Sequence, residues 1–419
     1  MLMAIYILFM LFLLAQGILV MYLNLYIWLD KDRIEQSGSP KKYADPKMTF
    51  TLMLPAYHEE EVLGDTIKLV AKQNYPKDMY EMLIILQPSD KGTIKVARDA
   101  IKEAKIKNAK ILIVDPDHTP LNKPYQLNYA LEHTNFDSLV IFDSEDEVHP
   151  NILNVANTLY EENDADIIQC GVQLMDYDST WFAAHNVLEY YFWFKSRMHA
   201  HMKVGAVPLG GNTVFFRTDQ VRKVDGWNEN CLCEDADIGI RLSLQGSKMM
   251  ASYDPYHVTK EETPHSIEQF IKQRTRWSQG FIQILRYGHW KKLGSPLKVL
   301  MALYLLGSPF LLVGMLLMGG LMAIIGQLAD LPFAVSILSF VPLLMVLSMI
   351  LLQMAALYDF VREQKLPLRL WVFVLFPVTF IPYLIMLSAG AIRATWRELK
   401  GQSNWEKTDH SGAHRKVTS

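Results

Sequence analysis

Long apolar segments flank a polar region in this chain of 419 residues. Four stretches contain no Asp, Glu, Lys or Arg: Met1–Leu29, Val299–Ala329, Leu331–Tyr358 and Leu370–Ile392. About 20 consecutive apolar residues suffice for a helix to cross a bilayer, so each stretch is long enough to be a membrane segment. The pattern predicts one polar domain attached to a membrane region. It excludes a purely soluble protein and a transporter that is buried wholly in the membrane.

Short apolar runs alternate with helical stretches in the polar region. Buried parallel strands are predicted at Thr49–Leu54, Met82–Leu86, Ile111–Val114 and Leu139–Phe142. Helices are predicted at Glu60–Gln73, Thr93–Lys107 and Pro124–His133. This rhythm is typical of an open α/β sheet with helices on both faces. Ligands of such sheets bind at the carboxyl ends of the strands, so residues that follow a strand are the first candidates for chemistry.

Charge and cysteine content exclude some functions. A net charge of −3 gives no basic surface for nucleic acid, so no nucleic-acid partner is expected. Cys170, Cys231 and Cys233 are too few for a disulfide framework, which favours a reducing compartment. The first apolar stretch lacks a positive start and exceeds the roughly 7–15 apolar residues of a signal peptide. We therefore expect this stretch to be an uncleaved membrane anchor.

Basic residues predict the orientation in the membrane. Lys31 and Arg33 follow the first apolar stretch and nothing basic precedes it, so the positive-inside rule places the polar domain in the cytoplasm. Pro377 and Pro382 interrupt the fourth stretch, and basic residues such as Arg397 follow it. We expect a re-entrant or interfacial path that keeps the tail cytoplasmic, with a full crossing as the alternative.

Three motifs follow the first predicted strands. Pro55–Glu60 reads P-A-Y-H-E-E, Asp90 lies in a glycine-containing turn, and Lys123 precedes a helix. Each has an ordinary explanation as a turn, a loop or a solvated surface residue. Lys123 is also placed to meet a phosphate at the positive end of a helix.

Acidic residues follow the fourth predicted strand and open a later helix. Asp143, Glu145 and Asp146 repel one another unless a cation binds, and Mg²⁺ typically combines carboxylates with substrate phosphates. A solvated acidic turn is the alternative. Asp235 lies at a helix start, where it is either a cap or a general base for an acceptor hydroxyl.

The segment Gln273–Trp277 reads Q-R-T-R-W. Arg276 suits a two-pronged contact with phosphates, and Trp277 suits stacking on a sugar ring. A helix at the membrane surface explains the same aromatic and basic residues and is compatible with both roles.

In this order, the motifs resemble glycosyltransferase family 2, and within it the membrane-embedded polysaccharide-synthase branch, which includes cellulose, hyaluronan and poly-N-acetylglucosamine synthases. The resemblance covers Met48–Arg286, more weakly the apolar segments, and again Trp405–Gly412. It implies an α/β domain of the GT-A nucleotide-diphospho-sugar transferase type with α-helical transmembrane segments. The expected parts are an anchor (1–29), the GT-A domain (48–264), an interfacial helix region (265–295), a membrane region of two spans plus a further span or re-entrant segment (296–392), and a tail (393–419).

The resemblance also implies roles for individual residues. Donor-binding residues would be Pro55, Tyr57, Glu59, Asp90, Lys123 and Asp143. Asp143 would hold a divalent cation, Mg or Mn, with either Glu145 or Asp146 completing the site. Asp235 would be the catalytic base beside Glu234, and Gln273, Arg276 and Trp277 would contact acceptor and diphosphate. The tail resembles a gating loop, with Trp405, Lys407, Thr408 and His410 forming a lid over the nucleotide.

The implied function is inverting transfer of a hexose or N-acetylhexosamine from a UDP-sugar to a growing β-linked glycan, at the cytoplasmic face of the cell membrane. The alternative acceptor is a lipid that receives a single sugar. Expected partners are the UDP-sugar, the glycan or lipid acceptor and membrane lipid, and the sequence does not indicate accessory subunits. A silent nucleotide-sugar sensor would not need the intact acidic motifs.

Overall fold

The computed structural model describes residues 2–206, 209–328, 332–408 and 411–416. The polar domain is built on a seven-stranded sheet in the order β3-β2-β1-β4-β7-β5-β8. β1 (Phe50–Ala56) pairs in parallel with β2 (Tyr80–Leu86) and β4 (Ser138–Ile141), and β2 pairs in parallel with β3 (Ala109–Ile113). These are the strands that the short apolar runs predict, and the predicted α/β class is confirmed.

The second half of the sheet was not predicted. β7 (Val214–Arg217) runs antiparallel between β4 and β5 (Ile167–Cys170), and β8 (Met249–Ser252) is parallel to β5. β6 (Val172–Leu174) and β9 (Thr259–Glu261) form a separate parallel pair. β3 is an edge strand and only partly covered, so the prediction of a fully buried strand is wrong there.

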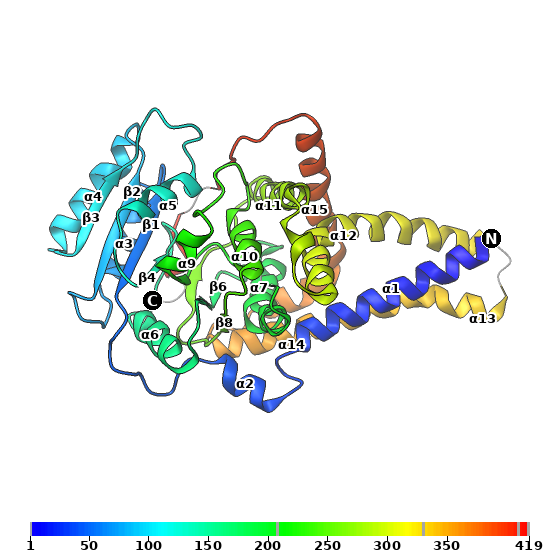
Figure 1. Cartoon of the computed structure of the whole chain (residues 1–419). Coiled ribbons are helices and arrows are strands. Elements are labelled where there is room, and N and C mark those ends of the chain that lie inside the picture. Colours follow the sequence, from blue (N-terminus) through cyan, green and yellow to red (C-terminus); the bar gives the residue numbers. More distant parts are fainter. Residues whose placement is uncertain (1, 207–208, 329–331, 409–410, 417–419) are drawn as a thin grey trace.

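Helices cover both faces of the sheet (Figure 1). One face carries α3 (Leu63–Val70), α4 (Lys91–Glu103) and α6 (Ile152–Asn163), and the other carries α5 (Lys123–Glu132), α9 (Thr218–Lys223) and α10 (Glu234–Leu244). Side chains alternate along β1: Leu52 and Leu54 pack into the first core, and Met53 packs into the second. Because both faces are covered, β1 is apolar at nearly every position.

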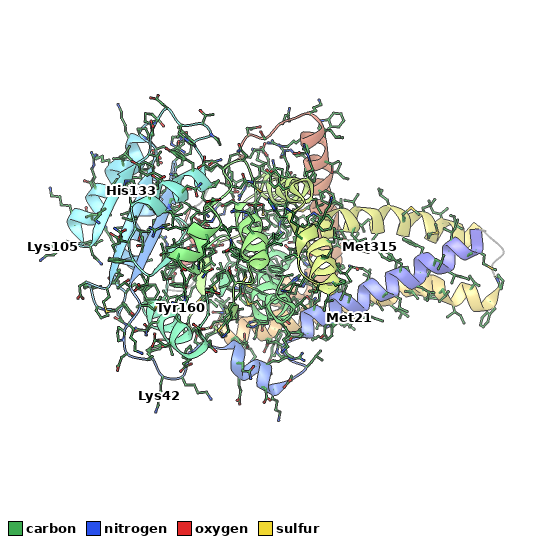
Figure 2. The ribbon with its side chains drawn as sticks, in the orientation of Figure 1. Met21, Lys42, Lys105, His133, Tyr160 and Met315 are labelled. Atoms are coloured by element: carbon green, nitrogen blue, oxygen red, sulfur yellow. The ribbon has the colours of Figure 1, made fainter. Side chains whose placement is uncertain are left out.

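Four helices are long and apolar enough to cross a membrane. They are α1 (Leu2–Leu25), α12 (Pro296–Leu328), α14 (Val341–Glu363) and α15 (Leu370–Leu399). α1, α12 and α14 project from the polar domain on the side away from β3 (Figure 1). Figure 2 labels Met21 on α1 and Met315 on α12 in this part, with Lys105 beyond α4 at the opposite end of the molecule.

The remaining elements join these two parts. They are α2 (Lys31–Ser37), α7 (Ala183–Phe192), the π-helix η1 (Trp193–Arg197), α8 (Met198–Val204), α11 (Ile267–Tyr287), the 3₁₀ helix η2 (His289–Lys292), α13 (Phe333–Ser336), and the 3₁₀ helices η3 (Ile337–Phe340) and η4 (Ala413–Lys416).

α15 follows a different path from the other long helices, because it packs along α11 (Figure 1). Near its start, Arg369 pairs with Asp178 at 3.1 Å. Near its end, Glu398 pairs with Arg286 of α11. Both ends of α15 therefore contact the polar domain. Pro377 and Pro382 lie inside the helix, which continues to Leu399 and so passes the expected start of the tail at residue 393.

Candidate active site

A cavity of about 860 Å³ lies where the carboxyl ends of β1 and β4 face α10 and α11. It brings together most of the residues that the sequence motifs single out: Pro55, Tyr57, Glu59, Lys123, Asp143, Glu145, Glu234, Asp235, Gln273, Arg276, Trp277, Trp405, Lys407 and Thr408. Asp90 and Asp146 are not among its lining residues, and His410 lies outside the described residues.

Three carboxylates meet in this cavity. One oxygen each from Asp143, Glu145 and Glu261 lies within 4.8 Å of the others. Burial, followed by the carboxylates of Glu145 and Asp143, raises the pKa of Glu261 to about 8. An all-oxygen set suits a hard divalent ion such as Mg²⁺ or Mn²⁺, which would relieve this repulsion. The donor set therefore fits the expected cation.

Asp146 has a different environment from the other acids of its motif. Its carboxylate accepts hydrogen bonds from the Asp143 backbone N–H at 2.9 Å and from the Asn212 amide at 3.1 Å. Asn212 also donates to Glu261. Burial and then Glu261 raise the pKa of Asp146 well above its usual value. Asp146 thus stabilises the loop of its motif through hydrogen bonds. Glu145, rather than Asp146, lies with Asp143 in the group of carboxylates that could hold an ion.

Lys123 lies at the start of α5 and points at the acidic cluster. Asn122 caps this helix through a side-chain oxygen that accepts from the Tyr125 N–H at 3.1 Å, which fixes the first turn. Lys123 pairs with Asp143 and donates to the Gly211 carbonyl at 3.3 Å. Burial alone would lower the pKa of Lys123, but Asp143 raises it, so the ammonium stays charged beside the cluster.

Asp235 lies in the first turn of α10. The N-cap is Cys233, which makes no side-chain capping bond, so Asp235 is not the cap. Asp235 Oδ1 accepts hydrogen bonds from the Cys233 thiol at 3.1 Å and from the Ala236 N–H at 2.8 Å. A Cβ built on Gly211 would lie 3.2 Å from Asp235 Oδ2, so this glycine keeps space open at the second oxygen. Burial and then Asp235 raise the pKa of neighbouring Glu234 to about 7.

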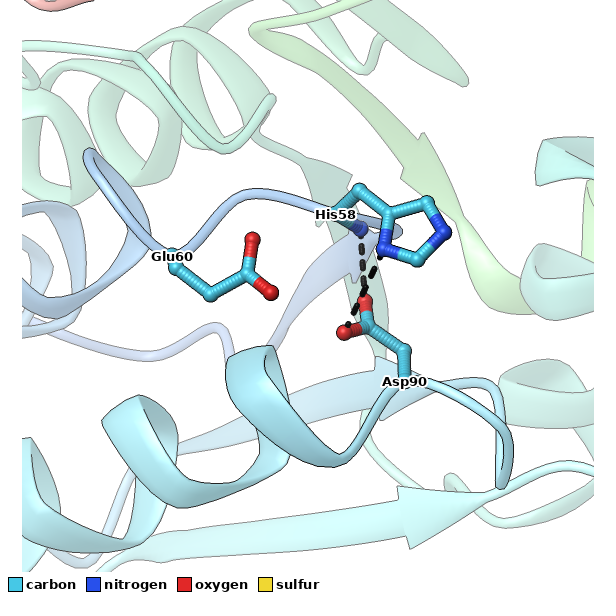
Figure 3. A group of neighbouring side chains, drawn as sticks. All are labelled: His58, Glu60 and Asp90. Carbon is cyan, nitrogen blue, oxygen red and sulfur yellow. Dashed lines mark hydrogen bonds and ion pairs between the residues drawn. The ribbon is translucent and has the colours of Figure 1, made fainter.

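Asp90 caps α4. Its carboxylate accepts from the backbone N–H of His58 at 2.6 Å and from that of Thr93 at 3.2 Å. Burial alone would raise the pKa of Asp90, but these bonds, led by the one from His58, lower it. Figure 3 shows Asp90 facing His58 and Glu60 at this turn. Asp90 therefore fixes the turn that carries Tyr57 and Glu59 into the cavity.

Trp405, Lys407 and Thr408 of the predicted lid segment line the cavity. The guanidinium of Arg276 lies 4.4 Å from the centre of the Trp405 ring, and that of Arg274 lies 4.5 Å from the Trp277 ring. Lys407 pairs with Glu59 at 3.1 Å. Burial, followed by Glu145, raises the pKa of Glu59 to about 8, although Lys407 acts in the opposite direction.

Glu262 anchors the end of this segment. Its side chain is 1% exposed and accepts from the backbone N–H groups of Ser411 at 2.5 Å, Gly412 at 3.1 Å and Ala413 at 2.7 Å. Further along, Arg415 donates to the Glu145 carbonyl at 3.0 Å. The tail is therefore tied to the loop that carries the acidic cluster.

Comparison with known proteins identifies the family. A model described as "Glycosyltransferase like family 2" matches residues 46–280, more than half of the chain. The chain belongs to glycosyltransferase family 2. This match does not distinguish the polysaccharide-synthase branch from others, so the branch stays a prediction.

Relatives of this family 2 chain carry names for different products. It is 23% identical over 243 residues to a probable glycosyltransferase, YdaM, of Bacillus subtilis (56% of this chain, 55% of the relative). It is 24% identical over 235 residues to a beta-monoglucosyldiacylglycerol synthase of Nostoc (56% and 49%). The chain thus spans about half the length of these curated relatives. A Pyrobaculum calidifontis mannosyltransferase, solved with GDP-Man and Mn²⁺, shares the fold at a TM-score of 0.60 and 16% identity (92% of this chain, 99% of that one).

Several residues that line the cavity of this family 2 chain lie outside the sequence motifs. Glu261, Asn212 and Arg197 line it, and none of them was predicted. Glu261 had only a weak signal, as an acidic residue at the end of the short polar strand β9, ahead of the Q-R-T-R-W helix. Asn212 and Arg197 had no signal in the sequence. Asn212 reaches the cavity through the pairing of β7, which it precedes, and Arg197 reaches it through the turn of η1.

Proposed function

We propose that this chain is a membrane-bound, inverting glycosyltransferase that moves a sugar from a nucleoside-diphosphate sugar to a hydroxyl group of a membrane lipid. The observation that carries the proposal is the extent of the cavity. It holds the acidic cluster and Asp235 at one end, and at the other it runs between α1 and α12. One continuous space therefore joins the candidate site to the membrane region.

The far end of the cavity supports a lipid rather than a growing glycan. Val20 of α1 and Leu305, Leu312 and Met315 of α12 line it. Lipid chains favour such apolar walls. A sugar polymer would leave most of its hydroxyls without partners there, because Gln16, Tyr304 and Ser308 are the polar side chains among the described residues of that stretch. Pro309, inside α12, lines the same stretch and interrupts the helix hydrogen bonds beside it.

In the proposed reaction, Asp235 removes the proton of the acceptor hydroxyl. The acceptor oxygen then bonds to the anomeric carbon from the side opposite the diphosphate. The bond between that carbon and the diphosphate oxygen breaks, and the nucleoside diphosphate leaves with the electron pair. General-base assistance of this kind contributes about 10²–10⁴-fold to the rate. Attack from the opposite face inverts the anomeric configuration.

Positive groups would stabilise the leaving diphosphate. Lys123 and Arg276 face the cavity, and the Nε of Arg276 is buried without a hydrogen-bond partner among the described residues. Asp143, Glu145 and Glu261 would hold a divalent ion, which when bound supplies further charge stabilisation to the same oxygens. Pro55, Tyr57 and Glu59 would border the nucleoside, with Asp90 supporting their turn. We keep a UDP-sugar as the expected donor.

The tail would act as a lid in this proposal. Trp405, Lys407 and Thr408 line the cavity, so donor entry requires Lys407 to leave Glu59 or to exchange that contact for the diphosphate. A lid of this kind excludes water from the reaction.

The contacts of α15 support one membrane topology. Both of its ends meet the polar domain, and its outward side chains, including Trp371, Val374, Val378, Ile385 and Trp396, are exposed. An interfacial helix with an apolar outer side and tryptophans near both ends fits these facts. We place α15 on the cytoplasmic surface of the cell membrane, with the tail and the domain on the same side.

The proposal is tested by supplying the purified protein in lipid nanodiscs with Mn²⁺ and a panel of sugar nucleotides. Release of nucleoside diphosphate together with a new glycolipid is expected. The absence of nucleotide release with every donor would overturn the enzymatic function. Nucleotide release with sugar found only in a long polymer would replace the lipid acceptor with a growing glycan.

A further inference from the structure

Arg197 is a cation in the cavity that the reaction described above does not use. It lies at the end of η1 and lines the cavity. Its Nε donates a hydrogen bond of 2.6 Å to the side-chain oxygen of Asn24, a fully buried residue near the end of α1. Among the residues that the structure describes, no carboxylate lies within ion-pair distance of the Arg197 guanidinium, although the Glu189 carboxylate, which also lines the cavity, attracts it from further away.

Neighbouring cations differ from Arg197 in this respect. Lys195, two residues earlier, pairs with Glu363 and, at 3.7 Å, with Asp359. Arg274, across the cavity, pairs with Glu189 at 2.5 Å. Glu189 thus gives its direct contact to Arg274, and Arg197 keeps only a longer-range attraction to it. A half-buried charge without a direct partner is costly, so the cavity is complementary to an anionic group at Arg197.

The π-helix explains how Arg197 reaches this position. A wider turn at Trp193–Arg197 rotates the following side chains relative to an α-helix, and π-turns of this kind recur at functional sites. Trp193 and Phe194 of the same turn line the cavity beside Arg197. Lys195 faces away from the cavity toward α14. Lys195 and Arg197 are two residues apart and so lie on opposite sides of the helix, which leaves Arg197 as the cation of this turn that lines the cavity.

Arg197 lies beside the domain end of α1, a helix that is long and apolar enough to cross a bilayer. Asn24, its partner, lies one residue from the end of an apolar helix, and such ends lie near lipid headgroups. Gln16 lies eight residues deeper along α1, about 12 Å at 1.5 Å per residue. There its amide donates to the Tyr304 hydroxyl at 3.1 Å, and the apolar walls of α12 continue from Leu305 to Met315.

We propose that Arg197 binds the phosphodiester of the acceptor, and that this acceptor is a glycerophospholipid with a hydroxyl in its headgroup. The headgroup hydroxyl extends toward Asp235, and the acyl chains lie between α1 and α12. A lipid monophosphate is disfavoured because its terminal oxygen is already ionised and would not need a general base. The inference rests on the proposed function and adds the chemical class of its acceptor.

The experiment compares acceptors in phosphatidylcholine nanodiscs that contain phosphatidylglycerol, diacylglycerol or a polyprenyl monophosphate. Sugar transfer to phosphatidylglycerol is expected, with a lower KM than for diacylglycerol. Arg197→Gln should raise the KM for phosphatidylglycerol at least tenfold and so reduce or abolish its advantage over diacylglycerol, because only the first lipid carries the phosphate. Arg197→Lys should give an intermediate KM, since it keeps the charge but loses the planar fork.

Arg33→Gln is the matched control. Arg33 lies in α2, shortly after the domain end of α1, where it stacks on Tyr26 and does not line the cavity. Its KM for phosphatidylglycerol should equal that of the wild type. Melting temperatures establish that each variant is folded, and the wild-type comparison of lipids stands even if Arg197→Gln does not fold.

Preferred transfer to diacylglycerol or to the polyprenyl monophosphate would overturn the inference, and so would an unchanged lipid preference in both Arg197 variants. These results leave the proposed glycosyl transfer intact. A failure of the proposed function is seen separately, as the absence of nucleotide release with every donor and lipid.

Discussion

Replacing Asp235 by Asn tests the assignment of the general base. The change is nearly isosteric, and the amide oxygen can still accept from the Ala236 N–H, which lies at 2.8 Å in the wild type. The amide cannot take a proton, so the expected loss is the whole general-base contribution. That contribution is about 10²–10⁴-fold in kcat, or roughly 2.7–5.4 kcal/mol of activation free energy. Donor affinity should change little, because Asp235 is not grouped with the three clustered carboxylates proposed to hold the ion.

Asp237→Asn on the same helix is the matched control for Asp235→Asn. Asp237 is 1% exposed, pairs with Arg241 at 2.7 Å and does not line the cavity. Losing this pair should lower the melting temperature while the kcat of the folded protein stays near wild type. The assay combines donor affinity by calorimetry, nucleotide release at saturating donor, and melting temperature. A kcat for Asp235→Asn within about tenfold of wild type would refute the base assignment.

Four further expectations follow from the cluster and the tail. Asp143→Ala or Glu261→Gln should weaken Mn²⁺-dependent donor binding about 10–100-fold by calorimetry; binding undiminished in excess chelator would contradict the ion site. Because Glu261 has a pKa of about 8, ion binding should strengthen from pH 6 to 8 and release a proton. In the ion-free protein, the contribution of Glu261 to the free energy of unfolding should fall as pH rises from 4.5 through about 8. An ion affinity that does not depend on pH would argue against Glu261 as a ligand. Truncation after Gln402 should reduce turnover at least about tenfold with the domain still folded; normal turnover would exclude a lid. A tag after Ser419 should resist labelling from outside intact cells, and external labelling would place the tail on the other side.

The sequence predicts the first half of the sheet well and the second half poorly, for a physical reason. β1, β2 and β4 are buried on both faces, so each is apolar at most of its positions. β7 is as short as β4 but runs antiparallel to both of its neighbours, β4 and β5. The position of β7 in the sheet depends on pairing with segments distant in the chain. The periodicity of apolar residues along the sequence carries no information about that pairing.

The site residues also divide into those that the sequence predicts and those that it does not. Asp143, Asp235 and Arg276 belong to motifs with fixed spacing, and the fold brings them to one cavity. Arg197 and Lys195 look equivalent in the sequence, but two residues apart in a helix they point to opposite sides, and packing decides that Arg197 meets the cavity and Lys195 meets Glu363. Side-chain direction after a helix irregularity depends on packing rather than on local sequence.

Identification of the sugar product tests the central claim most directly. The purified protein in nanodiscs is given a radiolabelled sugar nucleotide, Mn²⁺ and defined lipids. The extracted product is then analysed by mass spectrometry and by glycosidases of known anomeric specificity. The account predicts one nucleoside diphosphate released for each β-linked glycolipid formed, with both lost in Asp235→Asn. Label found only in a long polymer, an α-linked product, or nucleotide release with no sugar on any lipid would contradict it.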